Sequence, residues 1–143
     1  MIAIDTNLLI YAHRAGAPEH RAAQAAIERA AVAPGGWGIA QASVSEFWCQ
    51  VTHPRYPGGP STPTQAAGFL RALIQDAGAV VLAPGRNFHE RLLAEALHRR
   101  ISGPRIFDLQ IALAALDHGA KVLWTHDRGF QSLPGLRVLD PLA

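Results

Sequence analysis

The chain has 143 residues, 49% of them hydrophobic and 17% charged, which is typical of one compact domain with a substantial core. Its apolar runs are too short to span a membrane, and the net charge of +2 creates no strong field that would attract nucleic acid. A lone cysteine, Cys49, excludes an internal disulfide and fits a reducing cytoplasm. We therefore expect one soluble domain over residues 1–143. We expect no signal peptide, because Asp5 interrupts the first apolar run.

The chain begins with a short apolar run, Ile2, Ala3 and Ile4, which suits a strand buried on both faces of a parallel sheet. Residues 5–7 are expected to form a turn, and residues 8–12 to enter a buried helix. Asp5 would then lie at the carboxyl edge of the sheet, where open α/β proteins have their ligand crevice. The alternative is that Asp5 simply caps the helix that follows.

Further along, strand and helix patterns alternate without an internal repeat. Strands are predicted at 37–40, 79–82, 121–125 and 137–139, and helices at 18–32, 42–52, 62–77, 88–100 and 106–118. Residues 53–60 are rich in Pro and Gly and predict a loop. The helix after it has three start signals: Thr62 as N-cap, Pro63 at the first position and Gln65 at the capping-box position. This order predicts an α/β fold of three layers, α/β/α, with a central, mainly parallel sheet of four to five strands.

The helix predicted at 42–52 has an apolar stripe of Val44, Phe47, Trp48 and Val51, which we expect to pack in the core. Glu46 falls nearly opposite this stripe.

Two later acids also stand out from the ordinary surface charges. Asp108 begins a line along its helix that is otherwise apolar. Because desolvating an unpaired charge costs on the order of several kcal/mol, Asp108 must have a partner; helix capping is the competing explanation. Asp127 directly follows the strand predicted at 121–125, at the same edge as Asp5 if the two strands are parallel neighbours.

Acids gathered in one crevice would need a cation. At about 4 Å spacing each pair would repel by roughly 1 to 4 kcal/mol, so the groups must bind an ion or take up protons. Ligands that are all oxygen favour Mg²⁺ or Mn²⁺. No zinc-type spacing of His with Cys, no glycine-rich phosphate loop and no nucleophile elbow competes with this interpretation.

Four segments carry these acids in a recognisable order: Ile4-Asp5-Thr6-Asn7-Leu8-Leu9, Ser45-Glu46-Phe47, Asp108-Leu109-Gln110-Ile111-Ala112-Leu113-Ala114 and Thr125-His126-Asp127-Arg128-Gly129-Phe130. As a set they resemble the PIN-domain ribonucleases of the VapC toxin type, over nearly the whole chain. Two further stretches, Val51-Thr52-His53-Pro54-Arg55 and Leu133-Pro134-Gly135-Leu136, resemble an actinobacterial subgroup of these toxins.

The resemblance implies a catalytic and metal-binding cluster of Asp5, Glu46, Asp108 and Asp127. The cluster would hold one or two Mg²⁺ ions, with Mn²⁺ as a substitute, and Thr125 and Asn7 would orient the carboxylates. The resemblance further implies an RNA substrate, a cognate antitoxin protein and a homodimer. One position departs from the pattern: many relatives carry another acid two residues after the last Asp, where this chain has Gly129. A second metal site would therefore be poorer in ligands.

The resemblance thus implies a metal-dependent endoribonuclease, the toxin of a toxin–antitoxin pair, that cleaves RNA with a metal-activated water. Arg14, Arg55 and Arg128 are predicted RNA contacts. One alternative is a PIN-like module that binds RNA or protein without catalysis. Another is a haloacid-dehalogenase-like phosphatase, but such enzymes need a second Asp two residues after the first, where this chain has Asn7.

Overall fold

In the computed structural model, five strands form one sheet: β1 (Ile2–Ile4), β2 (Trp37–Ala40), β3 (Val80–Leu82), β4 (Val122–Trp124) and β5 (Arg137–Leu139). Their order is β3-β2-β1-β4-β5, and every neighbouring pair is parallel. The chain thus builds the sheet from β1 in one direction and later returns to add β4 on the other side of β1. Such a reversal leaves a crevice beyond the carboxyl ends of the two strands between which it occurs.

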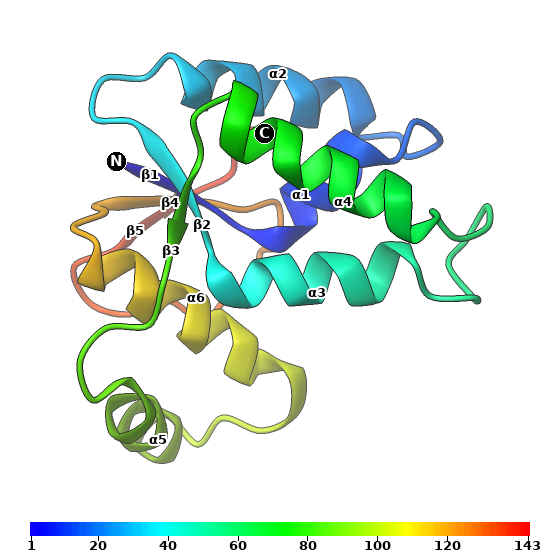
Figure 1. Cartoon of the computed structure of the whole chain (residues 1–143). Coiled ribbons are helices and arrows are strands. Elements are labelled where there is room, and N and C mark those ends of the chain that lie inside the picture. Colours follow the sequence, from blue (N-terminus) through cyan, green and yellow to red (C-terminus); the bar gives the residue numbers. More distant parts are fainter.

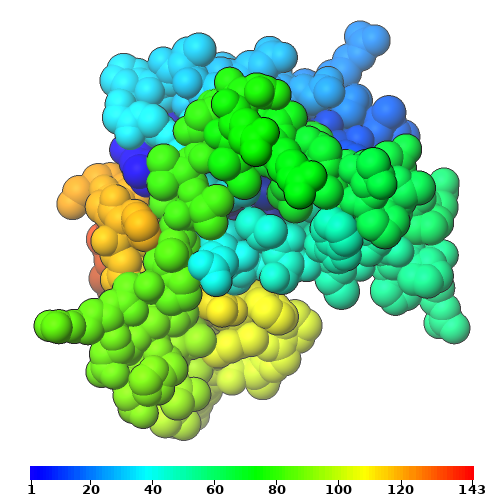
Figure 2. All heavy atoms as spheres, viewed as in Figure 1, coloured from blue at the N-terminus to red at the C-terminus, as the bar shows by residue number.

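Helices cover both faces of this sheet. They are α1 (Thr6–His13), α2 (His20–Ala31), α3 (Gln41–Val51), α4 (Pro63–Arg71), α5 (Phe88–His98) and α6 (Ile106–Asp117); a π-helical turn, Ala72–Asp76, extends α4, and a 3₁₀ turn, Gly103–Arg105, precedes α6. In Figure 1, α1, α2 and α4 lie above the sheet and α5 and α6 below it. In the space-filling view, α5 and α6 form the lower part of the molecule (Figure 2). The predicted α/β/α arrangement is confirmed, with five strands that are all parallel.

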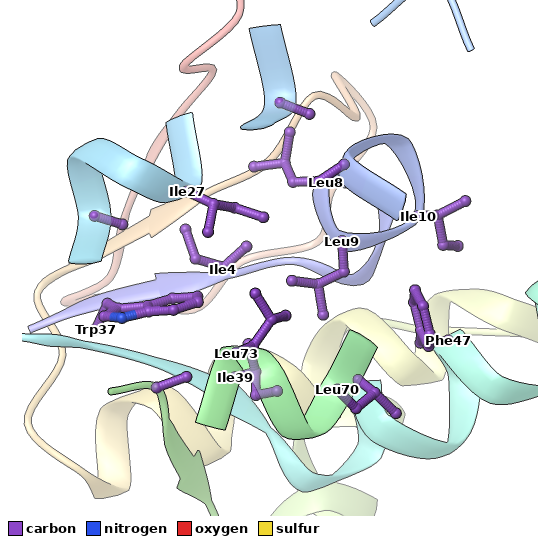
Figure 3. Packing of buried hydrophobic residues seen from close by; sticks show 14 of the residues in the cluster. Ile4, Leu8, Leu9, Ile10, Ile27, Trp37, Ile39, Phe47, Leu70 and Leu73 are labelled. Carbon is purple, nitrogen blue, oxygen red and sulfur yellow. The ribbon is translucent and has the colours of Figure 1, made fainter. Parts of the chain in front are cut away.

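The core has two parts, one on each side of the sheet. Along β1, Ala3 points into one part and Ile4 into the other, and they are 1% and 0% exposed. This two-sided burial is what the uninterrupted apolar run at the start of the chain predicts. Figure 3 shows the part around Ile4, where Trp37 and Ile39 from β2 meet residues of α1, α2 and α4. No helix combines the length and the apolar content needed to cross a bilayer.

Three local expectations need correction. The first helix begins at Thr6, directly after Asp5, without a separate turn, and α2 begins at His20 instead of Pro18. Trp48 was expected in the core but is 39% exposed. Ser43 is buried in its place, and its Oγ accepts a hydrogen bond of 2.9 Å from the Thr6 hydroxyl. The buried face of α3 therefore runs through Ser43, Phe47 and Val51, and Trp48 lies outside it. The predicted capping box at the start of α4 is confirmed.

Candidate active site

A cleft of about 400 Å³ opens beyond the carboxyl ends of β1 and β4. All four acids that the sequence singled out, Asp5, Glu46, Asp108 and Asp127, line it. Five other residues complete the lining: Asn7, Ile10, Gln50, Pro104 and Arg105. The acids come from four separate places, namely the end of β1, the middle of α3, the first turn of α6 and the loop after β4. The fold therefore brings together residues that are more than one hundred positions apart in the chain.

Asp5 is the deepest of these acids, at 6% exposed. Its Oδ1 accepts a hydrogen bond of 2.7 Å from the backbone N–H of Thr6, and its Oδ2 accepts one of 2.7 Å from the Thr125 hydroxyl. Burial raises the pKa of Asp5 to about 6; the two hydrogen bonds oppose this increase, and the charges of Asp108 and Glu46 add to it. Asp5 caps α1 and also faces the cleft, so the two roles weighed for it are compatible.

Thr125 is the hub of the hydrogen bonds at the bottom of the cleft and is itself buried. While its hydroxyl donates to Asp5, its Oγ1 accepts from the Asn7 side-chain amide at 3.2 Å and from the backbone N–H of Asp127 at 3.0 Å. The other polar atom of the Asn7 side chain, the carbonyl oxygen Oδ1, is buried and has no hydrogen-bond partner. Buried polar atoms are rarely left unpaired, so this oxygen indicates a ligand position.

Asp108 and Asp127 share one partner, Arg105. Its Nη1 donates to Asp108 Oδ2 at 3.0 Å and to Asp127 Oδ2 at 2.6 Å. This guanidinium is the main reason why the pKa of Asp127 lies below its usual value, and the backbone N–H of Gly129, which donates to Asp127 Oδ1, also lowers it. Asp108 Oδ2 also accepts from the backbone N–H of Gln131 at 3.0 Å. The predicted partner of Asp108 is therefore an arginine three residues before it.

Glu46 completes the acidic lining from α3. It is half-buried, and its carboxylate makes no hydrogen bond or ion pair. Gln50, one helical turn further on, lines the same cleft. Both side chains are therefore available to a ligand in the cleft.

The chemistry of this donor set fits a hard divalent cation, since every group is an oxygen donor. The unpartnered Oδ1 of Asn7 adds a neutral oxygen to the four carboxylates. No three Asp, Glu, His or Cys side chains, as they stand, converge closely enough to hold one ion. The bridge from Arg105 explains part of this, because it occupies the place between Asp108 and Asp127. An ion that used all the acids would have to displace this arginine.

None of the three arginines predicted to contact RNA lines the cleft. Arg14 lies in a larger groove of about 940 Å³ at the other end of α1, which contains none of the four acids. Its guanidinium stacks over Tyr56 and donates to the Ser61 hydroxyl, so it fastens the loop between α3 and α4. Arg55 and Arg128 are exposed.

Sequence reasoning missed two groups at the site. Arg105 had a usable signal, since a base three positions before an acid on one helix is a common pairing. The contact from Gln131 had none, because it comes from a backbone N–H whose position depends on the loop after β4.

The similarities to known proteins agree with this geometry. The family model described as "PIN domain" matches residues 2–136. The chain belongs to the PIN domain family. A VapC ribonuclease of Mycobacterium bovis, Mb2897, is 32% identical over 142 residues, which cover 99% of this chain and 96% of the relative. The resemblance to VapC-type PIN domains found in the sequence is confirmed.

Two solved structures share the PIN domain fold of this chain. One is VapC20 of Mycobacterium tuberculosis, a toxin that cleaves the sarcin-ricin loop, with a TM-score of 0.69, 14% identity and coverage of 91% of this chain and 92% of that one. The other is VapBC2 of Rickettsia felis bound to a DNA fragment from its promoter, with a TM-score of 0.64, 18% identity and coverage of 98% of both chains.

Proposed function

We propose that this PIN domain is a metal-dependent endoribonuclease, the toxin of a toxin–antitoxin pair, and that residues 1–143 act as one nuclease domain. Its catalytic and metal-binding residues would be Asp5, Glu46, Asp108 and Asp127. One observation carries the proposal: four carboxylates from four separate elements line a single cleft at the point where the strand order reverses. The full-length similarity to a VapC ribonuclease supports the choice of RNA as substrate.

The donor set favours Mg²⁺, with Mn²⁺ as a substitute. Asp5, Glu46 and Asp108 would hold the ion, and the free Oδ1 of Asn7 would contact it directly or through water. Asp127, which pairs with Arg105, would join them only where this arginine is displaced. Such an ion supplies a Lewis acid for the scissile phosphate and a water of lowered pKa.

The residues of the chain itself supply orientation and charge. Thr125 and the N–H of Thr6 fix both oxygens of Asp5, so this carboxylate is held in one orientation before any ligand arrives. Burial disfavours the charged form of Asp5, and a cation in the cleft would reverse this preference. The acids also repel phosphate, so RNA would bind productively only once positive charge has entered the cleft.

Partners follow from the same similarity. The solved VapBC2 assembly of Rickettsia felis supports a cognate antitoxin protein as the partner of this chain. Because the proposed substrate is RNA, we also propose that the protein acts in the cytoplasm. The resemblance to VapC toxins is the basis for proposing a homodimer. Of the three arginines that the sequence predicted to contact RNA, Arg128 is exposed next to Asp127 and is the one nearest in the chain to an acid of the cleft.

The test is cleavage of a defined structured RNA by the purified protein with Mg²⁺ or Mn²⁺. Asp5→Asn should abolish cleavage, because Asp5 is the most deeply buried of the acids. EDTA should abolish it too, because it removes the metal. Asp117→Asn is a matched control: this acid pairs with Arg91 outside the cleft, and its loss should leave cleavage intact. Cleavage that persists in the Asp5 variant would refute the mechanism. Metal binding without cleavage of any RNA would favour the non-catalytic binding module instead.

A further inference from the structure

Arg105 makes contacts that an ordinary surface ion pair does not. A single nitrogen, Nη1, bridges carboxylates from two different elements, Asp108 at the start of α6 and Asp127 in the loop after β4. The side chain lines the cleft and is 43% exposed, so it is held at the rim, between the acids and the solvent. Its other guanidinium nitrogens, Nε and Nη2, make no hydrogen bonds within the protein.

Gly129 provides the space that this guanidinium occupies. A Cβ placed on Gly129 would lie 2.5 Å from Nη2 of Arg105 and 3.2 Å from its Cζ. Any side chain at this position would therefore push the guanidinium away from the acids. The backbone of Gly129 does not have a positive φ, so conformation alone does not require glycine there. The lack of a side chain at Gly129 leaves the space that the Arg105 guanidinium fills.

The arginine divides the acidic cluster into two parts. Asp127 uses both of its oxygens within the protein, one with Arg105 and one with the N–H of Gly129. Asp108 uses only Oδ2, so its Oδ1 remains free. Three sets of oxygens in the same cleft as Asp5 are free to bind a ligand: this Oδ1, the Glu46 carboxylate and Oδ1 of Asn7.

From this geometry we infer that Arg105 is the second cation of the site. The inference rests on the proposed function. The chain would bind one divalent ion, through Asp5 and its neighbouring free oxygens, and the guanidinium would take the place of a second ion between Asp108 and Asp127. Its two free nitrogens would donate hydrogen bonds to a phosphate of the RNA, as arginine does well. Arg105 would thus be a catalytic residue that touches the substrate.

The experiment counts Mn²⁺ ions per chain by equilibrium dialysis and detects ion pairs by the Mn–Mn coupling in electron paramagnetic resonance. The wild-type protein should bind one ion and show no coupling. Arg105→Gln should bind a second ion and show coupling, because Asp108 and Asp127 are then without a cation. Arg105→Lys, which keeps the charge, should remain at one ion. Arg128→Gln is the matched control for loss of an exposed arginine beside the cleft and should also remain at one.

Gly129→Ala gives an independent test, since its methyl group would lie 2.5 Å from Nη2 of Arg105 and would displace the guanidinium, while Asp127 Oδ1, at 3.3 Å, would need to shift only slightly. It should also bind a second ion. If circular dichroism shows that Arg105→Gln does not fold, the number of ions bound by Gly129→Ala tests the role of Arg105 instead. The Michaelis constant for RNA, measured with only the tighter ion site filled, should rise about tenfold in Arg105→Gln, from the loss of charge-assisted hydrogen bonds.

Two kinds of failure can be separated. Two ions in the wild-type protein, or one ion in both Arg105→Gln and Gly129→Ala, would overturn the role of Arg105 and leave the proposed ribonuclease standing. If no protein in the series bound Mn²⁺, the proposed metal-dependent function would fail, and this inference with it.

Discussion

Replacing Asp5 with asparagine should make the metal-free protein more stable at neutral pH, although it removes a central residue of the site. Burial raises the folded-state pKa of Asp5 from 3.8 to about 6. The folded protein therefore holds a proton more tightly than the unfolded chain, and its stability falls as the pH rises from about 4 to about 6. At pH 7.5 this penalty amounts to about 3 kcal/mol. A neutral asparagine would not carry it.

The gain is partly offset by a lost hydrogen bond. The Thr125 hydroxyl donates to Asp5 Oδ2, and its oxygen already accepts from Asn7 and from the N–H of Asp127. It has no capacity left to accept from a new amide, and a lost hydrogen bond of this kind costs about 1 to 1.5 kcal/mol. The net stabilisation at pH 7.5 is therefore about 1 to 2 kcal/mol. Because the wild-type carboxyl is largely protonated at pH 4.5, the advantage should shrink by about 2 kcal/mol there.

Urea unfolding with EDTA at pH 7.5 and at pH 4.5 measures both numbers, and the difference between the two proteins cancels the other titrating groups. Mn²⁺ at one hundred times its dissociation constant should add about 2.7 kcal/mol to the wild-type protein and much less to the variant. The reasoning is refuted if Asp5→Asn is less stable than the wild-type protein at pH 7.5, or if the difference between them does not depend on pH.

Three further substitutions test other parts of the structure. Thr125→Val should cut RNA cleavage at least tenfold and cost about 1 to 3 kcal/mol in urea unfolding, since it leaves several buried polar groups unpaired; unchanged cleavage would contradict its orienting role. Gly38→Ala places a Cβ 2.7 Å from a backbone oxygen of the neighbouring strand, so thermal unfolding should show a loss of about 1 to 3 kcal/mol; an unchanged Tm would show that the strands can separate. Arg91→Gln breaks the ion pair with Asp117 that ties α5 to α6, and should lower Tm slightly without affecting cleavage; a loss of cleavage would show that the position of α5 matters to the site.

The sequence predicted those features that depend on neighbouring residues. An apolar run that ends in an acid located Asp5, and Thr62 with Gln65 located the start of α4. Each of these signals is contained within a few consecutive residues. Trp48 was misplaced because an apolar stripe sets which residues share a face, whereas the rotation of the helix depends on what it packs against. Here the buried face of α3 runs through Ser43, Phe47 and Val51, with Ser43 in contact with Thr6 at the start of α1.

The bridge from Arg105 was beyond prediction for a different reason. Its contact with Asp108 is local, but its contact with Asp127 joins residues that only the finished sheet brings together. The space for the guanidinium depends on the path of the loop at Gly129. Such a contact is a property of two loops and a helix end at once, and no pattern within one element reports it.

The order of the strands also has a consequence for how the protein is made. Its central strand, β1, is synthesised well before its partner β4, which follows α6 in the chain. A nascent chain that has reached α5 carries only Asp5 and Glu46, without Thr125 to hold Asp5 or the two later acids to complete the cleft. Long-range pairing of this kind forms late in folding. Under the proposed ribonuclease function, a growing chain therefore has no complete acidic cluster until the segment that carries Asp127 has been made.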